Sequence, residues 1–218
     1  MGSGPTTQTT NGFGLLRQFV PRRRNAEACE LCSAEISLYH PHLLELGNRR
    51  LLCTCDACAL LFTGQAKTKY RRVPRDIRIL DSFELSDADW DAFMIPINMA
   101  FFFTDSQSGG VHAYYPSPAG AIESLLSLES WVSIVKGNPV LQNMQSDVEA
   151  LLVSRAMHGR SVCSEYFLLP IDECYRLVGI IRNNWRGFSG GSEVWREIAE
   201  FFAGLRNRAV RISREHHA

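Results

Sequence analysis

The chain has 218 residues, of which 45% are hydrophobic and 21% are charged, and its 23 Lys and Arg residues balance its 23 Asp and Glu residues. This composition is that of a soluble globular protein, and it excludes collagen-like, low-complexity and wholly disordered chains. The balanced charge argues against a dedicated nucleic-acid binder, because such proteins usually carry a basic excess.

No run of residues approaches the roughly 18–20 apolar positions of a membrane-spanning helix. The sequence begins with a stretch rich in Gly and Thr, which lacks the basic and apolar regions of a secretory signal. We therefore expect a cytoplasmic protein without a membrane span. In a reducing compartment, its seven cysteines serve as metal ligands or free thiols rather than as disulfides.

Charge and cysteine are unevenly distributed along the chain. Residues 1–80 have a net charge of +6, residues 81–218 have a net charge of −6, and five of the seven cysteines lie between positions 29 and 58. These shifts predict two folded parts joined by a basic segment. We predict a flexible basic N-terminal arm over 1–24, a four-cysteine zinc module over 25–66, a basic linker over 67–79, an α+β domain over 80–212 and a tail over 213–218.

Two Cys-x-x-Cys pairs carry the clearest chemical signal. Cys29 and Cys32 form the first pair, and Cys55 and Cys58 form the second after 22 intervening residues. A tight turn between two thiolates lets both sulfurs reach one ion, and two such turns complete a tetrahedral site with bonds of roughly 2.3 Å for zinc. The spacing therefore predicts one zinc ion held by these four cysteines.

The residues between the two pairs predict the fold around the metal. Apolar stretches at 43–46 and 51–53 flank Gly47 and Asn48, which is the pattern of a β-hairpin. The second cysteine pair leads into residues 59–62, which can begin a helix. A cysteine turn, a hairpin and a helix in this order are typical of a treble-clef zinc module. A segment of roughly 40 residues has too little core to fold readily without such a staple.

Other metals and other ligands remain possible at this stage. Iron in a rubredoxin-like site also uses two Cys-x-x-Cys turns, although Ser33 and Ala59 stand where such turns usually have Gly; an iron–sulfur cluster is a further alternative. Cys53 could replace Cys55, but its spacing from Cys58 is wrong for a tight turn. We therefore prefer Cys55 as the ligand and expect Cys53 to be a small buried residue.

His40 and His42 flank Pro41 at the start of the predicted hairpin. Two histidines two residues apart share one face of a strand. They could bind a second metal ion, or one of them could replace a thiolate of the first site. Histidines that face solvent or pack against the hairpin are the commoner outcome.

The second half of the chain predicts a larger domain with two hairpins and several helices. Its last two helices place apolar residues on one face of a 3.6-residue period. Hairpins with separate helices favour an α+β domain over a parallel sheet. We expect an antiparallel sheet of about four strands, covered on one side by helices. The predicted elements are hairpins at 97–104 with 111–115 and at 148–154 with 166–169, and helices at 125–135, 172–185 and 192–208.

The connection between the last two helices contains candidate docking residues. Trp185, Arg186 and Phe188 lie in it, and Trp and Arg are the residue types favoured at binding hot spots. We therefore predict that these three residues contact a partner. The alternatives are a simple turn between helices, capped at Ser192, and a pocket for a small anion. We recognise no catalytic motif.

Several blocks of the sequence resemble a family of uncharacterised bacterial proteins, defined as a domain of unknown function, whose genes often lie beside those for NiFe-hydrogenases. The resemblance covers about residues 13–209 and is most specific over 170–202. It rests on the blocks CELC, HPHLLEL, RRLLCTCDACALLF, YYPSPAGAIESLL, DVEALLV and PIDECYRLVGIIRNNWRGFSGGSEVWREI.

The resemblance implies an accessory role near a hydrogenase, with a hydrogenase subunit or a maturation protein as partner, and it implies no reaction. Two hypotheses follow from the sequence as a whole. In the first, the chain is a zinc-binding, non-enzymatic accessory or interaction protein. In the second, the four thiolates hold iron, and the chain transfers single electrons as a rubredoxin does.

Overall fold

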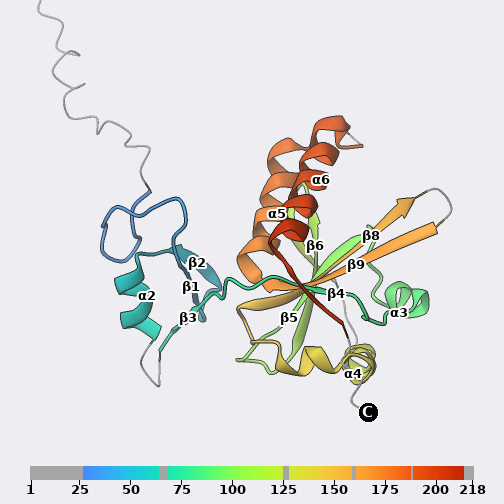
Figure 1. The fold of residues 1–218 in the computed structure, drawn as a ribbon, viewed down its shortest axis with the longest axis horizontal. Helices are drawn as coiled ribbons and strands as arrows, with labels where there is room; N and C mark the ends of the chain where they lie inside the picture. The colour runs from blue at the N-terminus through green and yellow to red at the C-terminus, as the bar shows by residue number, and fades with distance from the viewer. Residues whose placement is uncertain (1–26, 64–67, 125–127, 159–160, 188, 214–218) are drawn as a thin grey trace, which may run out of the picture.

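The computed structural model describes residues 27–63, 68–124, 128–158, 161–187 and 189–213. The predicted N-terminal arm over 1–24, nearly all of the predicted tail and the candidate docking residue Phe188 lie outside these residues. The described chain forms an α+β fold, as predicted, with two sheets of different size. Figure 1 shows the smaller sheet and its helix to one side of the larger sheet.

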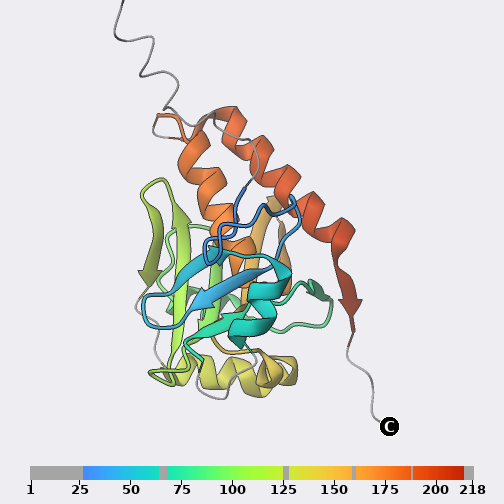
Figure 2. The same ribbon diagram turned by 90° about the vertical axis from the view of Figure 1, so that its left-hand side faces the viewer.

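The smaller sheet contains the predicted hairpin. Strand β1 (His42–Glu45) pairs antiparallel with β2 (Arg50–Cys53), and helix α2 (Asp56–Thr63) follows β2 directly. A third strand, β3 (Tyr70–Arg72), pairs with the other edge of β1. We call residues 27–63 and 68–73 the N-terminal unit. It lies in front of the larger sheet in the view of Figure 2.

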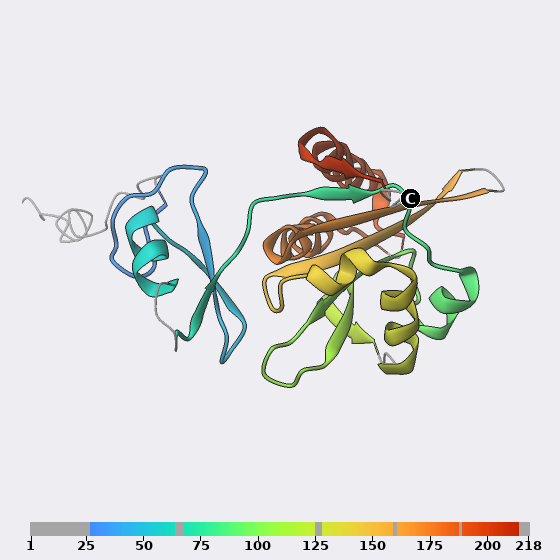
Figure 3. The ribbon, with the colours of Figure 1, turned by 60° about the horizontal axis from the view of Figure 1, so that its bottom comes forward.

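The segment expected to be a linker, residues 67–79, contains strand structure in its described part. Strand β3 belongs to the smaller sheet, and strand β4 (Arg78–Leu80) already belongs to the larger one. Figure 3 shows this segment running from one sheet to the other. Each strand has only three residues, which is too short for a periodic pattern to show in the sequence.

The larger sheet has seven strands in the order β10-β4-β9-β8-β5-β6-β7, rather than the four expected. Both predicted hairpins are present, β5 with β6 and β8 with β9. The sheet is mixed, because β10 pairs parallel with β4. The expectation missed β4 and β10, which have three residues each and pair with distant parts of the chain, and β7, which pairs with the preceding β6. The remaining bounds are β5 (Met99–Thr104), β6 (Val111–Ser117), β7 (Gly120–Ser124), β8 (Glu149–His158), β9 (Ser161–Pro170) and β10 (Val210–Ile212).

Helices cover both faces of the larger sheet, whereas the sequence predicted one covered face. Side chains of a strand alternate between faces, and β5 shows the result. Phe101 packs toward α5, with its ring centroid 6.0 Å from that of Tyr175, whereas Phe102 stacks on Trp131 of α4 at 5.7 Å. The helices and the 3-10 turn η1 are α3 (Asp87–Ala92), α4 (Leu128–Gly137), η1 (Pro139–Asn143), α5 (Ile171–Asn184) and α6 (Gly191–Arg208).

An ionic cluster around the buried Asp147 joins the N-terminal unit to the larger sheet. The guanidinium of Arg49 lies 3.7 Å from Asp105 and 3.8 Å from Asp147, and Arg71 approaches Asp147 to 3.2 Å. The Asp147 side chain is only 2% exposed. Arg49 also stacks over the ring of Phe103, 4.1 Å from its centroid. A buried carboxylate requires such partners, because removal from water disfavours its charge.

Candidate metal centre

The four cysteines predicted as ligands converge on one place. Their sulfurs lie within 4.8 Å of one another, and the sulfurs of Cys32 and Cys55 are 3.7 Å apart. Four sulfurs around a tetrahedral ion with bonds of roughly 2.3 Å are about 3.8 Å apart. The arrangement therefore fits a metal ion, and none of the seven cysteines is in a disulfide.

The first cysteine pair lies on a tight turn. The N–H of Cys29 donates to the carbonyl of Ala34 at 2.7 Å, and the N–H of Ser33 donates to the carbonyl of Cys29 at 2.8 Å. Ser33 has a φ of 61°, in the left-handed region, which reverses the chain directly after Cys32. The turn is tied to the hairpin through Glu30, whose N–H donates to the carbonyl of Cys53 at 2.9 Å.

The second pair lies at the beginning of helix α2. Cys55 directly precedes the helix, and the N–H of Cys58, in its first turn, donates to the sulfur of Cys55 at 3.4 Å. Unpaired N–H groups and the partial positive charge at a helix N-terminus stabilise thiolates. The predicted helix is present, and it opens with the second ligand pair, as expected for a treble-clef module.

Two of the four sulfurs, those of Cys29 and Cys58, differ in their affinity for protons. Burial opposes ionisation of Cys29, but the backbone N–H groups of Cys55, Leu31 and Cys32 outweigh it and lower the pKa of Cys29 to about 6. Burial and the three neighbouring sulfurs raise the pKa of Cys58 to about 12. Four adjacent thiolates repel one another, and a bound cation removes that repulsion. Metal binding in such a set releases protons.

Cys53 belongs to a different group. One ligand atom from each of His40, His42 and Cys53 lies within 4.8 Å of the others. Cys53 is thus placed with the two histidines, while Cys55 is placed with the other three cysteines. The sequence pointed to the histidine pair but did not connect it to Cys53.

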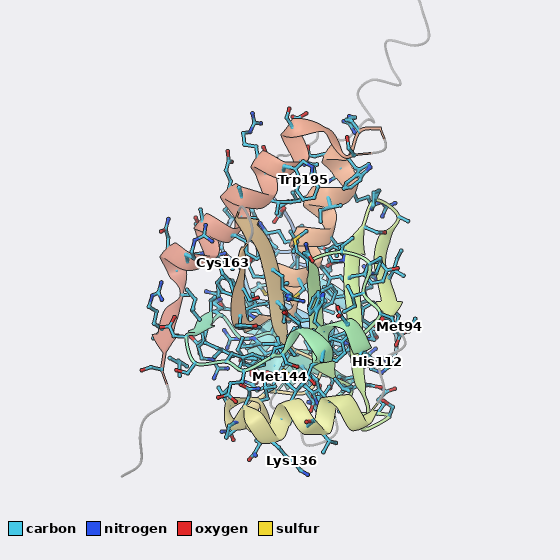
Figure 4. All side chains as sticks on the ribbon, turned by 90° about the vertical axis from the view of Figure 1, so that its right-hand side faces the viewer. Met94, His112, Lys136, Met144, Cys163 and Trp195 are labelled. Carbon is cyan, nitrogen blue, oxygen red and sulfur yellow. The ribbon has the colours of Figure 1, made fainter. Side chains whose placement is uncertain are left out.

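Of the candidate docking residues, Trp185 lines a groove. The groove has a volume of about 1010 Å³ and is also lined by Trp195 of α6, whereas Arg186 is exposed and is not part of the lining. The apolar-face pattern placed Trp195 in the core, but it is 50% exposed. Figure 4 labels Trp195 on α6 and Cys163 on β9, which also lines the groove.

Gly190 leaves room for the side chains of the two tryptophans to pack side by side. It has a φ of 85° and precedes α6 in the capping position, where Ser192 was predicted. A Cβ at Gly190 would lie 2.8 Å from Val194 and 3.0 Å from the Trp185 ring. The missing side chain therefore allows Trp185 to pack beside Trp195, with ring centroids 6.3 Å apart.

Fold and site together define an α+β protein with a four-cysteine cluster suited to a metal ion. The chain belongs to DUF5947, a family of unknown function, whose model matches residues 28–209. No curated protein and no solved structure matches the chain. Within the described part of the chain, no helix has both the length and the apolar character needed to cross a membrane.

Proposed function

We propose that the protein is a zinc-binding, non-enzymatic interaction protein of the cytoplasm, and that the groove between α6 and the larger sheet binds a segment of a partner. The observation that carries this proposal is the pairing of two tryptophans, Trp185 and Trp195, along a mostly apolar groove. The sequence resemblance to proteins encoded beside NiFe-hydrogenase genes suggests a hydrogenase subunit or a maturation protein as the partner.

The chemistry of the groove favours an apolar anchor from the partner. Ile181, Ile198 and Phe202 contribute apolar side chains to its lining. Both carboxylate oxygens of Glu165 accept hydrogen bonds from Arg206, at 3.0 and 2.9 Å. This arrangement resembles the apolar centre and polar rim of protein interfaces. A partner segment with an aromatic or large aliphatic side chain flanked by polar residues fits this lining.

Zinc in the four-cysteine site has a structural role in this proposal. When bound, it cross-links the turn at Cys29 to the beginning of α2 and leaves no coordination position for a substrate. Iron in the same site is the competing assignment, and it would make the protein an electron carrier. The visible spectrum separates the two, because a ferric tetrathiolate is red and a zinc tetrathiolate is colourless.

The docking proposal is tested with Trp195→Ala. Trp195 is half exposed, so its truncation leaves the buried core in place. Binding to purified hydrogenase subunits and maturation proteins is measured by calorimetry. A hot-spot tryptophan contributes at least about 2 kcal/mol, so affinity for the true partner falls at least roughly thirtyfold. The control is Met94→Ala, which removes an apolar side chain that is 79% exposed and lies outside the groove. Equal affinities for wild type and Trp195→Ala contradict the proposal.

A further inference from the structure

The hairpin brings two histidines and one cysteine together outside the four-cysteine cluster. His42 on β1 is paired directly with Cys53 on β2, and directly paired residues project to the same face of a sheet. His40 precedes His42 by two residues. Pro41, between the histidines, accepts hydrogen bonds from both the N–H and the hydroxyl of the buried Thr54, each at 3.0 Å. The backbone that presents both rings is therefore fixed.

The hydrogen bonds of the two rings determine where their protons lie. Nδ1 of His42 is 2.6 Å from a carboxylate oxygen of Asp172, and Nδ1 of His40 is 2.8 Å from the carbonyl of Ser37. Both partners are acceptors, so each Nδ1 donates a proton. The two Nε2 atoms of the neutral rings then present lone pairs to each other, at a separation of 3.2 Å. Two lone pairs at this distance repel unless a cation lies between them.

A metal ion satisfies this arrangement. Nitrogens bound to a tetrahedral zinc ion at roughly 2.0–2.1 Å are about 3.3–3.4 Å apart, close to the observed separation. Histidine ligands of metals typically donate their other ring N–H to a carboxylate or a backbone carbonyl, as both rings do here. We propose that His40, His42 and Cys53 form a second metal site that binds a divalent transition-metal ion such as Zn²⁺.

The second site differs from the four-cysteine site in kind. Three protein ligands leave one position of a tetrahedral ion for water or an exogenous ligand, as in catalytic zinc sites. The His42 side chain is 31% exposed, so solvent reaches this place. Asp172, which orients His42, lies in the first turn of α5. The site therefore depends on contact between the N-terminal unit and the larger sheet.

Zinc stoichiometry tests the proposal, which does not rest on the docking function. The 218-residue chain is equilibrated with micromolar Zn²⁺, separated from free metal and analysed for zinc. We expect two zinc ions per wild-type chain, and one fewer in His42→Ala and in Cys53→Ser. His112→Ala is the matched control, because its Nδ1 also contacts a carboxylate, that of Glu123 at 2.6 Å; this variant keeps the wild-type zinc content.

Asp172→Asn gives a second readout. Asp172 is a positioning residue, and loss of such a carboxylate typically weakens metal affinity 10–100-fold. We expect Asp172→Asn to reduce the weaker of the two zinc affinities by roughly 10–100-fold and to leave the tighter one unchanged. Unchanged zinc content in both His42→Ala and Cys53→Ser overturns the site, because the histidines are then joined by a shared proton instead. Weakening of both zinc affinities in Asp172→Asn overturns its assigned role.

Discussion

The N-terminal unit and the larger sheet differ in how much apolar surface they bury. The N-terminal unit has two buried groups of three residues each, one of which contains two of the metal-ligand cysteines. The larger sheet buries aromatic and aliphatic side chains on both faces. Hydrophobic burial grows with the apolar area removed from water. The larger sheet therefore has its own source of stability, whereas the N-terminal unit buries little apolar surface of its own and relies on its neighbour, the larger sheet.

Strand β1 shows how the neighbour contributes. Leu43 faces α2 within the N-terminal unit, whereas the adjacent Leu44 belongs to the core that packs under α5 and α6. Both side chains are fully buried. One face of the small sheet is thus covered by its own helix and the other by the larger sheet. The small sheet therefore depends on tertiary contact with the larger sheet for the burial of one of its two faces.

The largest expected effect comes from removing a cysteine ligand. Cys29→Ser and Cys58→Ser should lose the metal of the four-cysteine site and unfold residues 27–63, because metal-binding energy in small sites is largely folding energy. Metal analysis and hydrogen exchange measure the two effects. Cys163→Ser, which removes an exposed thiol, serves as the control and keeps the metal.

The same experiment tests whether the two regions unfold separately. We expect strands β8 and β9 to retain their protection from hydrogen exchange after metal loss, since their core lies on both faces of the larger sheet. If β8 and β9 lose protection together with β1 and β2, the chain is one cooperative unit. The predicted domain boundary near residue 80 would then be wrong.

The second prediction breaks the contact between the regions. Arg49→Met removes a cation that faces the buried Asp147, and we expect the free energy of unfolding to fall by about 2–3 kcal/mol. This is less than the roughly 3–5 kcal/mol typical of an unpaired buried charge, because Arg71 still faces Asp147. Arg50→Met is the matched control. Arg50 pairs with Glu30 on the surface, and such pairs contribute at most about 1 kcal/mol. If urea unfolding shows the same loss of unfolding free energy in Arg49→Met and in Arg50→Met, Arg49 has no special role in joining the two regions.

A third prediction concerns Arg186, which directly follows the groove residue Trp185 in the chain. Arg186 donates hydrogen bonds to the carbonyls of Asn183 and Trp185 and is otherwise exposed. Arg186→Ala should leave zinc content unchanged and alter thermal stability little. If Arg186 contacts the partner, affinity falls, by up to roughly thirtyfold for a hot-spot arginine. If Arg186→Ala binds the partner as tightly as wild type does, Arg186 is not part of the contact, and docking involves the two tryptophans alone.

The smallest expected effect is on pH dependence. The Ser108 hydroxyl is the main cause that lowers the pKa of Asp105 to about 2, although burial opposes it, and Arg49 also contributes. A carboxylate whose pKa is lowered by folding stabilises the fold above its unfolded value of about 3.9, and this contribution is lost as pH falls toward 2. Asp105→Asn should therefore cost stability at neutral pH and less in acid.

Acid also releases metal from thiolates, so the measured quantity is the difference in unfolding free energy between wild type and variant across pH. Asp91→Asn, which removes an exposed carboxylate, is the matched control. A pH-independent difference for Asp105→Asn would show that folding does not lower the pKa of Asp105.

The sequence determined the features that depend on neighbouring residues. The cysteine pairs, the hairpin between them, the two hairpins of the larger sheet and the last two helices all have patterns within a few residues or turns. The three-residue strands β3, β4 and β10 have no such pattern, and their pairing is set by distant segments. Trp195 shows the same limit of local sequence patterns. Its position on the apolar face of α6 predicted a buried side chain, but the packing of α5 against α6 leaves that side chain half exposed in the groove.

The contacts that join the two regions were decided by tertiary structure alone. His42 and Asp172 are 130 residues apart in the chain, and Arg49 meets Asp147 across nearly 100 positions. No local periodicity relates such pairs. Each pair forms only when folding brings both partners to the same place. Folding of the whole chain thereby gives His42 a carboxylate partner, Asp172, that sequence spacing could not reveal.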